Sequence, residues 1–571
     1  MISTILCCVL GKVFYGIKNR FMKPCLIFII LITMTINVSV PAFATGGYSD
    51  LNWFGIACLS IIYAPSYISK KISNTIEEIK DKRGSSILIV DTETDTVTMK
   101  GGLSKTGWGE ESMIVVGNKA VLGGYSSILI VDIDTGKVVE KGRLSETAWG
   151  RKSTVAVGNK VVMGRPDWDV GSSILIIDID TGKVSQKKGL SEAAWGYESM
   201  AVVGNKVVMG PGNKDGGNSI LIVDPLKGSV VEKKGLPIAR RGYNSMAVVG
   251  NKVVMGRGYL DGGTSVLIVD TEEETVVEMG GLPKDDWGNY STVSVGNKVV
   301  MGVFGSILII DAATGNITEK GGLSKTSWGY GSTVVVGNKV VMGCAGDGGT
   351  SILIIDTVKN TVAEKRGLSK FRWGYNSTVV VGNKVVMGSG WDSTSILIVD
   401  PVSGTVAEKK GVSKGNWGLY NTVVVGDKVV MGSNRDCSSI LIIDPVKGTV
   451  IEKRGFSKNE DGWGCNSTVV VGNKVVMGYG SYYDGCTSVL IIDPVKGTVT
   501  ENGGLSKAQW GFNAIAVAGN KVVMGPGYYG GTSILIIDVV TETVTEKGGF
   551  YKDRWGYNAM AVVGNKVVMG L

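Results

Sequence analysis

The chain has 571 residues, of which 84 are glycine, 12 are proline and none is histidine, and its formal charge is +8. Glycine at about 15% is twice its ordinary usage and 44% of the residues are hydrophobic, which excludes a disordered or collagen-like chain. The lack of histidine excludes Ser-His-Asp and Cys-His catalysis and histidine-ligated zinc or copper, so the composition favours binding over catalysis and no cofactor is expected.

Residues 1–44 have the three parts of a secretory signal peptide. Basic residues precede a long apolar run, and small residues end the segment at Ala44. This pattern predicts export with cleavage after Ala44, whereas an uncleaved run would be a membrane anchor. Met22 is an alternative start to Met1, because the stretch from Met22 to Ala44 is a complete signal by itself. We therefore expect a secreted or extracytoplasmic protein with no stable membrane span after cleavage.

Residues 45–84 are predicted to be a linker with one short amphipathic helix. Isoleucines recur at helical spacing between Ile68 and Lys82. Such a helix would dock on the main domain or touch a membrane surface, and we favour docking. No basic cluster stands out in the chain, so nucleic acid is not an expected partner.

Residues 85–571 repeat one motif eleven times. The string Ser-Ile/Val-Leu-Ile-Val/Ile-Asp returns every 41 to 49 residues. Its aspartates are Asp91, Asp132, Asp178, Asp224, Asp270, Asp311, Asp356, Asp400, Asp444, Asp493 and Asp538. A near-constant period of this length indicates a solenoid, a propeller or an array.

One unit predicts four short strands and no helix. Ser351 to Asp356 is a β-branched run, and Thr361 to Lys365 alternates apolar and polar residues. Thr378 to Val381 and Lys384 to Met387 flank a Gly-Asn hairpin turn. Four strands per unit predict an all-β fold, a β-propeller with one four-stranded blade per repeat.

Eleven blades exceed the usual four to eight, so the repeats form one large ring or two rings of about six and five blades. No linker interrupts the repeats, and we therefore favour one ring. The chain begins on the third strand of a blade and ends on the second. Its first hairpin can therefore complete the last blade and remove two exposed sheet edges.

The unit from Gly235 to Asp270 resembles a kelch repeat. It has a Leu-Pro-Arg loop, an inner strand, a glycine turn and a strand that ends in Asp. The resemblance extends over residues 85–571 and implies a kelch-type propeller. Most units depart from it with Met-Gly in place of the Gly-Gly doublet and with tryptophan in place of the loop arginine, which remains only at Arg241.

Ligand-binding residues are expected on the face whose loops differ between blades. These loops join strand two to strand three, and exposed rings on a rigid scaffold suit contact with a peptide or a sugar. The candidate residues are Trp168, Tyr259, Trp391, Tyr482, Tyr483, Tyr528 and Tyr529. Arg241 is a further candidate, because it breaks the pattern of a tryptophan repeated in ten units; those tryptophans are expected to pack between blades.

The cysteines show no metal-binding spacing. Cys437, Cys465 and Cys486 all fall on loops of the variable face, and we predict that two of them form a disulfide, with Cys465 and Cys486 as the favoured pair.

We expect a secreted, non-enzymatic scaffold that binds a protein or a glycan. Two alternatives stay open. Some exported propellers that resemble this chain act on sugars, and a mutarotase-type enzyme would need only a modest acid–base group. A structural surface protein built of similar units is the other alternative.

Overall fold

The computed structural model describes residues 86–104, 107–144, 148–166, 168, 171–212, 216–258, 264–283, 287–344, 349–390, 393–433, 439–456, 462–479 and 485–571. The predicted signal peptide (1–44) and the whole of the predicted linker (45–84) lie outside the described residues. In the described residues, no helix is both long enough and apolar enough to span a membrane.

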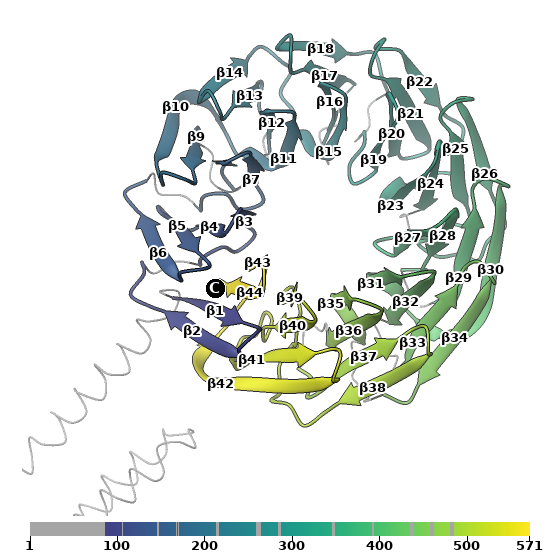
Figure 1. Ribbon diagram of the computed structural model, residues 1–571. Coiled ribbons are helices and arrows are strands. Elements are labelled where there is room, and N and C mark those ends of the chain that lie inside the picture. Colours follow the sequence, from purple (N-terminus) through teal and green to yellow (C-terminus); the bar gives the residue numbers. More distant parts are fainter. Residues whose placement is uncertain are drawn as a thin grey trace, which may run out of the picture. The chain divides into compact units, whose positions relative to one another are not determined.

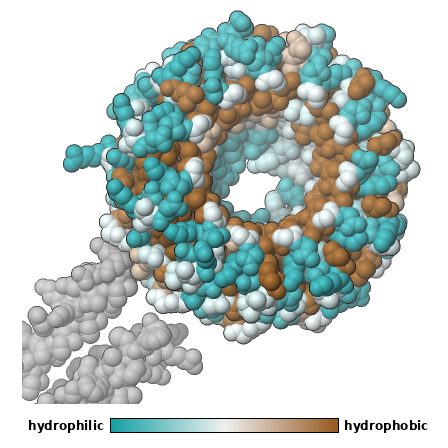
Figure 2. Space-filling view, viewed as in Figure 1, coloured by the Kyte–Doolittle hydropathy of each residue, from teal (hydrophilic) through white to brown (hydrophobic). Residues whose placement is uncertain are grey.

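Eleven four-stranded antiparallel sheets form one closed ring around a central opening (Figures 1 and 2). The prediction of a single large propeller is confirmed. We number the blades in chain order: blade 1 is β3–β6, blade 10 is β39–β42, and blade 11 combines both ends of the chain as β43, β44, β1 and β2.

The strands fall into four sets by their place in the blade. The innermost strands are β3 (Met113–Val116), β7 (Thr154–Val157), β11 (Trp195–Val203), β15 (Arg241–Val249), β19 (Thr292–Val295), β23 (Trp328–Val336), β27 (Thr378–Val381), β31 (Trp417–Val425), β35 (Trp463–Val471), β39 (Ile515–Ala518) and β43 (Met560–Val563). The second strands are β4 (Lys119–Gly123), β8 (Lys160–Met163), β12 (Lys206–Pro211), β16 (Lys252–Arg257), β20 (Lys298–Val303), β24 (Lys339–Cys344), β28 (Lys384–Met387), β32 (Lys428–Ser433), β36 (Lys474–Tyr479), β40 (Lys521–Met524) and β44 (Lys566–Met569).

The third strands carry the repeated aspartate. They are β1 (Ile87–Asp91), β5 (Ile128–Asp132), β9 (Gly171–Asp178), β13 (Ile220–Asp224), β17 (Val266–Asp270), β21 (Ser306–Asp311), β25 (Ile352–Asp356), β29 (Ser393–Asp400), β33 (Ser439–Asp444), β37 (Val489–Asp493) and β41 (Gly531–Asp538). The outer strands are β2 (Thr96–Lys100), β6 (Lys137–Lys141), β10 (Val184–Ala193), β14 (Ser229–Lys233), β18 (Thr275–Met279), β22 (Ile317–Lys320), β26 (Thr361–Lys365), β30 (Thr405–Gly415), β34 (Thr449–Arg454), β38 (Thr498–Asn502) and β42 (Thr543–Asp553).

The ring closes by pairing the two ends of the repeat region. Strand β1 pairs with β44 in antiparallel register, with Ile89 opposite Val568 and Val90 opposite Val567. The predicted completion of the last blade by the first hairpin is therefore confirmed. Closure gives blade 11 a four-stranded sheet like those of the other blades. Neither of the two terminal hairpins is therefore left as an isolated pair of strands.

The core lies between neighbouring blades and is shared by them. One cluster joins Val386 and Ile398 of blade 7 to Trp417 and Met431 of blade 8. All ten repeated tryptophans are buried, so the prediction that they pack between blades is confirmed. Each blade face is thus covered by the next blade, which explains why the third strands read as continuous apolar runs.

Glycine at the end of the second strand permits this close packing. A Cβ at Gly388 would lie 1.9 Å from the carbonyl oxygen of Trp417 in the next blade. The equivalent glycine meets the carbonyl of the next blade in the same way at 1.7–2.1 Å around the ring. No other residue fits there without separating two blades, because real Cβ atoms do not approach an oxygen so closely.

The blade topology divides the connections between two faces. Connections from strand two to three and from strand four to the next blade lie on one face, which we call the collar face. The opposite face, here the turn face, carries the Gly-Asn hairpins and the turns that follow the repeated aspartates. The collar face contains the sequence-variable loops.

We expect Gly388→Ala to lower the free energy of unfolding by about 2 kcal/mol, because the methyl group overpacks the interface between blades 7 and 8. Gly142→Ala is the matched control, since a Cβ there meets no atom within 4 Å. Urea unfolding of both variants checks this, and equal midpoints would contradict the close-contact argument.

Candidate functional site

The innermost part of the collar face is built from one residue per blade in a left-handed conformation. It follows the Trp-Gly-x sequence of ten units and Arg241-Gly242-Tyr243 in blade 4, and it has a φ between 45° and 59°. We call these residues the collar: Glu111, Lys152, Glu198, Asn244, Tyr290, Gly331, Asn376, Tyr420, Asn466, Asn513 and Asn558. Five of the eleven are asparagine, which tolerates a left-handed backbone better than most residues.

Backbone hydrogen bonds connect the collar from blade to blade. The amide of Lys152 donates to the carbonyl of Glu111 at 2.7 Å, and the amide of Glu111 donates to the carbonyl of Asn558 at 2.8 Å across the closure. The same bond joins Glu198 to Lys152, Tyr290 to Asn244, Gly331 to Tyr290, Asn376 to Gly331, Tyr420 to Asn376, Asn513 to Asn466 and Asn558 to Asn513, at 2.7–2.9 Å. The collar side chains therefore stand on a rigid frame.

The collar residues immediately precede the innermost strands or lie near their start, so they surround the central opening at the collar face. Hydrogen-bonded neighbouring chains lie about 4.8 Å apart, so a closed circle of eleven is on the order of 15 Å wide between backbones. A bound segment narrower than this cannot contact all eleven collar residues at once. The sectors differ in chemistry, because the collar residues differ from blade to blade.

Charged side chains occupy the sector formed by blades 1 to 4. Lys152 Nζ lies 2.7 Å from Glu198 Oε1 and 3.7 Å from Glu111 Oε1. Arg151 pairs with Glu111 at 2.9 Å, and Asn244 Nδ2 donates to Glu198 Oε2 at 2.9 Å. Because these groups are partly buried and held by several bonds each, their geometry is set before any ligand arrives.

The ionisation states in this sector follow from the same contacts. Burial by itself would lower the pKa of Lys152, but the hydrogen bond and charge of Glu198 outweigh it and raise the pKa. Burial would raise the pKa of Glu198, but bonds from Lys152, Asn244 and Tyr243 outweigh it and lower the pKa. Burial, together with the nearby Glu198 charge, raises the pKa of Tyr290 to about 12. All of these groups keep one charge state near neutral pH.

Tyrosines form the adjacent sector, from blade 5 to blade 8. The ring centroids of Tyr290 and Tyr330 are 4.9 Å apart, and those of Tyr330 and Tyr375 are 5.9 Å apart and stacked. Tyr420 continues the row with a hydrogen bond to Tyr375. Tyr290 and Tyr420 are 42% and 45% exposed, so the row presents aromatic surface to solvent.

Three of the predicted loop residues, Trp168, Tyr528 and Tyr529, are within the described residues and lie beside other side chains of the collar face. Trp168 is 59% exposed, and the Arg151 guanidinium lies 4.7 Å from the centre of its ring. The ring of Tyr528 is 5.5 Å from Tyr557 and 5.5 Å from Tyr529. Trp168 thus extends the charged sector outward. The other predicted residues, Tyr259, Trp391, Tyr482 and Tyr483, lie outside the described residues.

The prediction that Arg241 contacts a ligand is corrected by its burial. Its side chain has no exposed surface. Arg241 Nη2 donates to the Pro237 carbonyl at 3.2 Å and pairs with Glu278 at 3.1 Å. In blade 7, Trp373 donates to the carbonyl of Ser369, also four residues earlier, at 3.0 Å. Arg241 therefore takes over the structural bond of the tryptophan that it replaces.

The predicted disulfide between Cys465 and Cys486 is not formed. Both side chains are buried as thiols. Cys465 lies at the start of the innermost strand β35, whereas Cys486 follows the loop after β36 and its Sγ is 3.2 Å from Ser488 Oγ. The two residues belong to one blade, but Cys465 lies on its innermost strand and Cys486 in the connection between β36 and β37.

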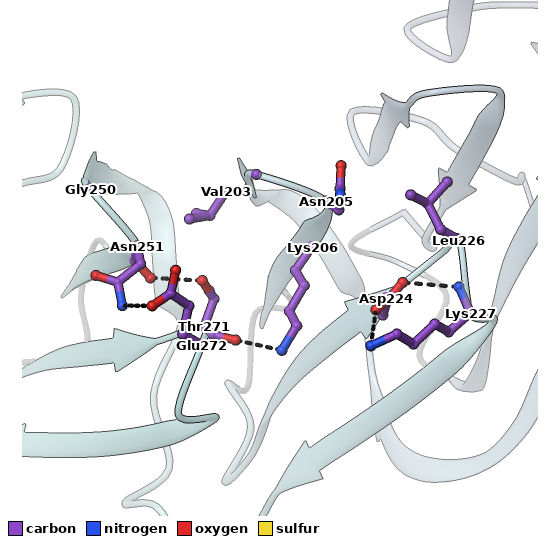
Figure 3. Close-up of a pocket in the computed structure, with 11 residues that line it drawn as sticks. Val203, Asn205, Lys206, Asp224, Leu226, Lys227, Gly250, Asn251, Thr271 and Glu272 are labelled. Carbon is purple, nitrogen blue, oxygen red and sulfur yellow. Dashed lines mark hydrogen bonds and ion pairs between the residues drawn. The ribbon is translucent and has the colours of Figure 1, made fainter.

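The turn face has clefts between neighbouring blades, and Figure 3 shows one of about 550 Å³ between blades 3 and 4. Here Lys206 of the Gly-Asn-Lys turn donates to the Thr271 carbonyl at 2.6 Å and pairs with Glu274 at 2.8 Å. Lys227 pairs with Asp224 at 3.4 Å. Lys206 thus binds the next blade, whereas Lys160, Lys339, Lys384 and Lys428 pair with the aspartate of their own blade. Among the residues that the structure describes, no cluster of Cys, Asp or Glu could hold a metal ion.

The collar residues were missed by sequence reasoning, although a signal exists. When the units are aligned on Trp-Gly-x, asparagine is the commonest next residue. Departures from it are Glu111, Lys152, Glu198, Tyr290, Gly331 and Tyr420. These departures mark the charged and tyrosine sectors. The sequence does not show that these residues are neighbours, because only the closed ring brings residues of successive repeats together.

No protein-family model matches this sequence, and no curated protein is significantly similar to it. Solved structures are similar in fold. Dihydro-heme d1 dehydrogenase NirN in complex with DHE is 11% identical over 67% of this chain and 80% of that chain, with a TM-score of 0.36. Apo AztD from Citrobacter koseri is 12% identical over 59% of this chain and 93% of that chain, with a TM-score of 0.31. These likenesses concern the propeller fold alone.

Arg241→Ala should lower the free energy of unfolding by about 3 kcal/mol, because it leaves the Glu278 carboxylate without its closest cation. Arg241→Trp should cost less, since it restores the residue that fills this place in ten other units. Chemical denaturation compares the two variants. A stable Arg241→Ala protein that loses ligand binding would instead support the original ligand-contact prediction.

Proposed function

We propose that this protein is a non-enzymatic scaffold that binds a protein segment or a glycan chain across its collar face. The observation that carries the proposal is the convergence of exposed and partly buried side chains at one end of the central opening. Lys152, Glu198, Tyr290 and Tyr420 come from four different blades and stand on one hydrogen-bonded frame. Held this way, they lose little conformational entropy on binding.

The chemistry of the two sectors fits an extended, amphipathic ligand. Tyrosine rings offer flat apolar faces for sugar rings or apolar side chains, and their hydroxyl groups can donate or accept hydrogen bonds. The neighbouring Lys152 and Glu198 supply a cation and a carboxylate for polar groups further along the same ligand. Trp168 adds an aromatic face at the outer edge of the charged sector.

Acid–base catalysis of the mutarotase type is supported less well. A general acid or base works best when its pKa is near the operating pH. The contacts in the charged sector move the pKa of Lys152 up and that of Glu198 down, away from neutrality. A purely structural role would not require the aromatic surface at Tyr290 and Tyr420 to remain exposed.

We also infer that the ring is of the kelch type and is exported. The strand order within each repeat agrees with the kelch pattern, in which the aspartate ends the third strand. Export is inferred from residues 1–44 of the sequence. A secreted scaffold meets glycans and surface proteins, which are the partner classes proposed for the collar.

Tyr290→Asn with Tyr420→Asn should weaken ligand binding at least roughly tenfold without lowering stability. Both residues have a positive φ, and asparagine already occupies this place in five blades, so the frame is preserved. Binding of the full chain to glycan and peptide arrays identifies the ligand class, and titration of the variant measures the loss. Met99→Ala on outer strand β2 is the control. Unchanged binding by the double variant would refute the tyrosine sector as the site.

Binding should change little between about pH 6 and pH 9, provided that the ligand itself does not titrate there. Glu198 has a lowered pKa and stays ionised above its usual range, while Lys152 has a raised pKa and stays protonated into the alkaline range. Tyr290 remains neutral because its pKa is about 12. Affinity measured across this range checks the prediction, and a steep change near neutrality would point to a catalytic-type group instead.

A further inference from the structure

The turn face carries an arc of exposed valines that the collar does not explain. In each blade, the residue two positions after the repeated aspartate forms the tip of the turn between strands three and four. In the five consecutive blades 6 to 10 this residue is a valine that is 67–71% exposed. These residues are Val358, Val402, Val446, Val495 and Val540.

Hydrogen bonds hold each valine at the tip of its turn. The amide of Val402 donates to Asp400 Oδ1 at 2.9 Å, and the amide of Val446 donates to Asp444 Oδ1 at 3.1 Å. The other three tips have the same bond at 2.9–3.1 Å. The aspartate also accepts a hydrogen bond from the next amide along the chain. The backbone bonds thus keep the apolar side chains presented to solvent.

Charge divides the turn tips into two opposite sectors. In the valine sector, three of the five valines are followed directly by a lysine: Lys359, Lys447 and Lys496. In blades 11, 1, 2 and 4 the same tip position is acidic, with Glu93, Asp134, Asp180 and Glu272. Leu226 and Ala313 occupy it in blades 3 and 5. One side of the turn face is therefore apolar and cationic at its tips, and the other is acidic.

We propose that the valine arc docks on an anionic lipid surface. Blade repetition places the five tips at equivalent heights around the ring, but each tip belongs to a separate blade. A flat, deformable partner can surround all five tips at once, whereas a compact protein would have to span five blades. Apolar tips flanked by lysines match the boundary between acyl chains and anionic headgroups. The acidic sector would be repelled, so the ring would attach by one edge.

This docking surface is independent of the collar, because the two lie on opposite faces. The protein could therefore be held at a membrane while its collar stays accessible to a ligand. No membrane-spanning element is needed, since shallow insertion of side chains and charge attraction together give reversible attachment.

Co-sedimentation of the full chain with lipid vesicles tests the proposal. We expect binding to phosphatidylcholine vesicles that contain phosphatidylserine and much weaker binding to pure phosphatidylcholine. Val402→Ser, Val446→Ser and Val495→Ser combined should lower the partition coefficient roughly tenfold or more. Lys359→Gln, Lys447→Gln and Lys496→Gln combined should also weaken binding and reduce its dependence on salt.

Matched controls separate the arc from general hydrophobicity. Leu226→Ser changes the same turn position in blade 3, outside the arc, and should leave vesicle binding unchanged. Tyr420→Asn alters the collar and should also have no effect on vesicles. Thermal unfolding verifies that each variant is folded, which is expected because the substituted side chains are exposed.

Three results would overturn the proposal. The first is no binding of the unmodified chain to anionic vesicles. The second is binding that the valine variant retains in full. The third is a dimer of the full chain, seen by analytical ultracentrifugation, that the valine variant abolishes without any vesicle binding; this result would make a second copy of the chain the occupant of the arc.

Discussion

The structure depends on the close approach of each blade to the next at the end of its second strand. There a glycine lies against the carbonyl of the following blade, as Gly388 does against Trp417. The same tryptophan carries its ring into the core that the two blades share. This contact is repeated at every interface, so each blade meets the next in the same way, and eleven such steps close the circle. The left-handed collar residue that follows the tryptophan then brings its backbone within hydrogen-bonding distance of the next blade.

A second repeated network anchors the connection that enters each blade. In blade 7, Glu408 accepts hydrogen bonds from Ser395 of its own third strand and from the amide of Ser369 in the incoming connection, and the Ser369 carbonyl accepts the bond from Trp373. Blade 4 has Pro237 in place of the serine, and Pro237 lacks an amide proton. Arg241 compensates, because its guanidinium bonds both the Pro237 carbonyl and Glu278. The network in blade 4 thus stays intact. A proline at this place does not by itself require the arginine, because Pro283 of blade 5 accepts the hydrogen bond of Trp287 at 3.2 Å.

These interfaces leave two surfaces that can vary without disturbing the ring. On the collar face, side chains such as Lys152 and Tyr420 differ between blades while the backbone beneath them stays the same. On the turn face, the aspartate that shapes each turn is constant, and the residue at the tip ranges from Glu93 to Val446. A rigid repeat thus separates the stability of the protein from the chemistry of its faces. The proposed ligand site and the proposed membrane contact each use one of them.

The sequence by itself determined the elements that depend on local pattern. The repeated Ser-Ile-Leu-Ile-Val-Asp string, the Gly-Asn turns and the position of the tryptophans sufficed to predict four-stranded blades, tryptophan packing and closure by the first hairpin. Trp168 was singled out because it stands in a loop that breaks the repeat, and its role in ligand binding stays a prediction. Only the tertiary structure decided the rest. The number of blades in a ring depends on the angle between blades, which the contact of Gly388 with Trp417 sets across the interface. Likewise, Lys152 and Glu198 are 46 residues apart and meet only because consecutive blades align. The buried position of Arg241 also depends on tertiary structure, because its partner Glu278 lies on another strand of the same sheet.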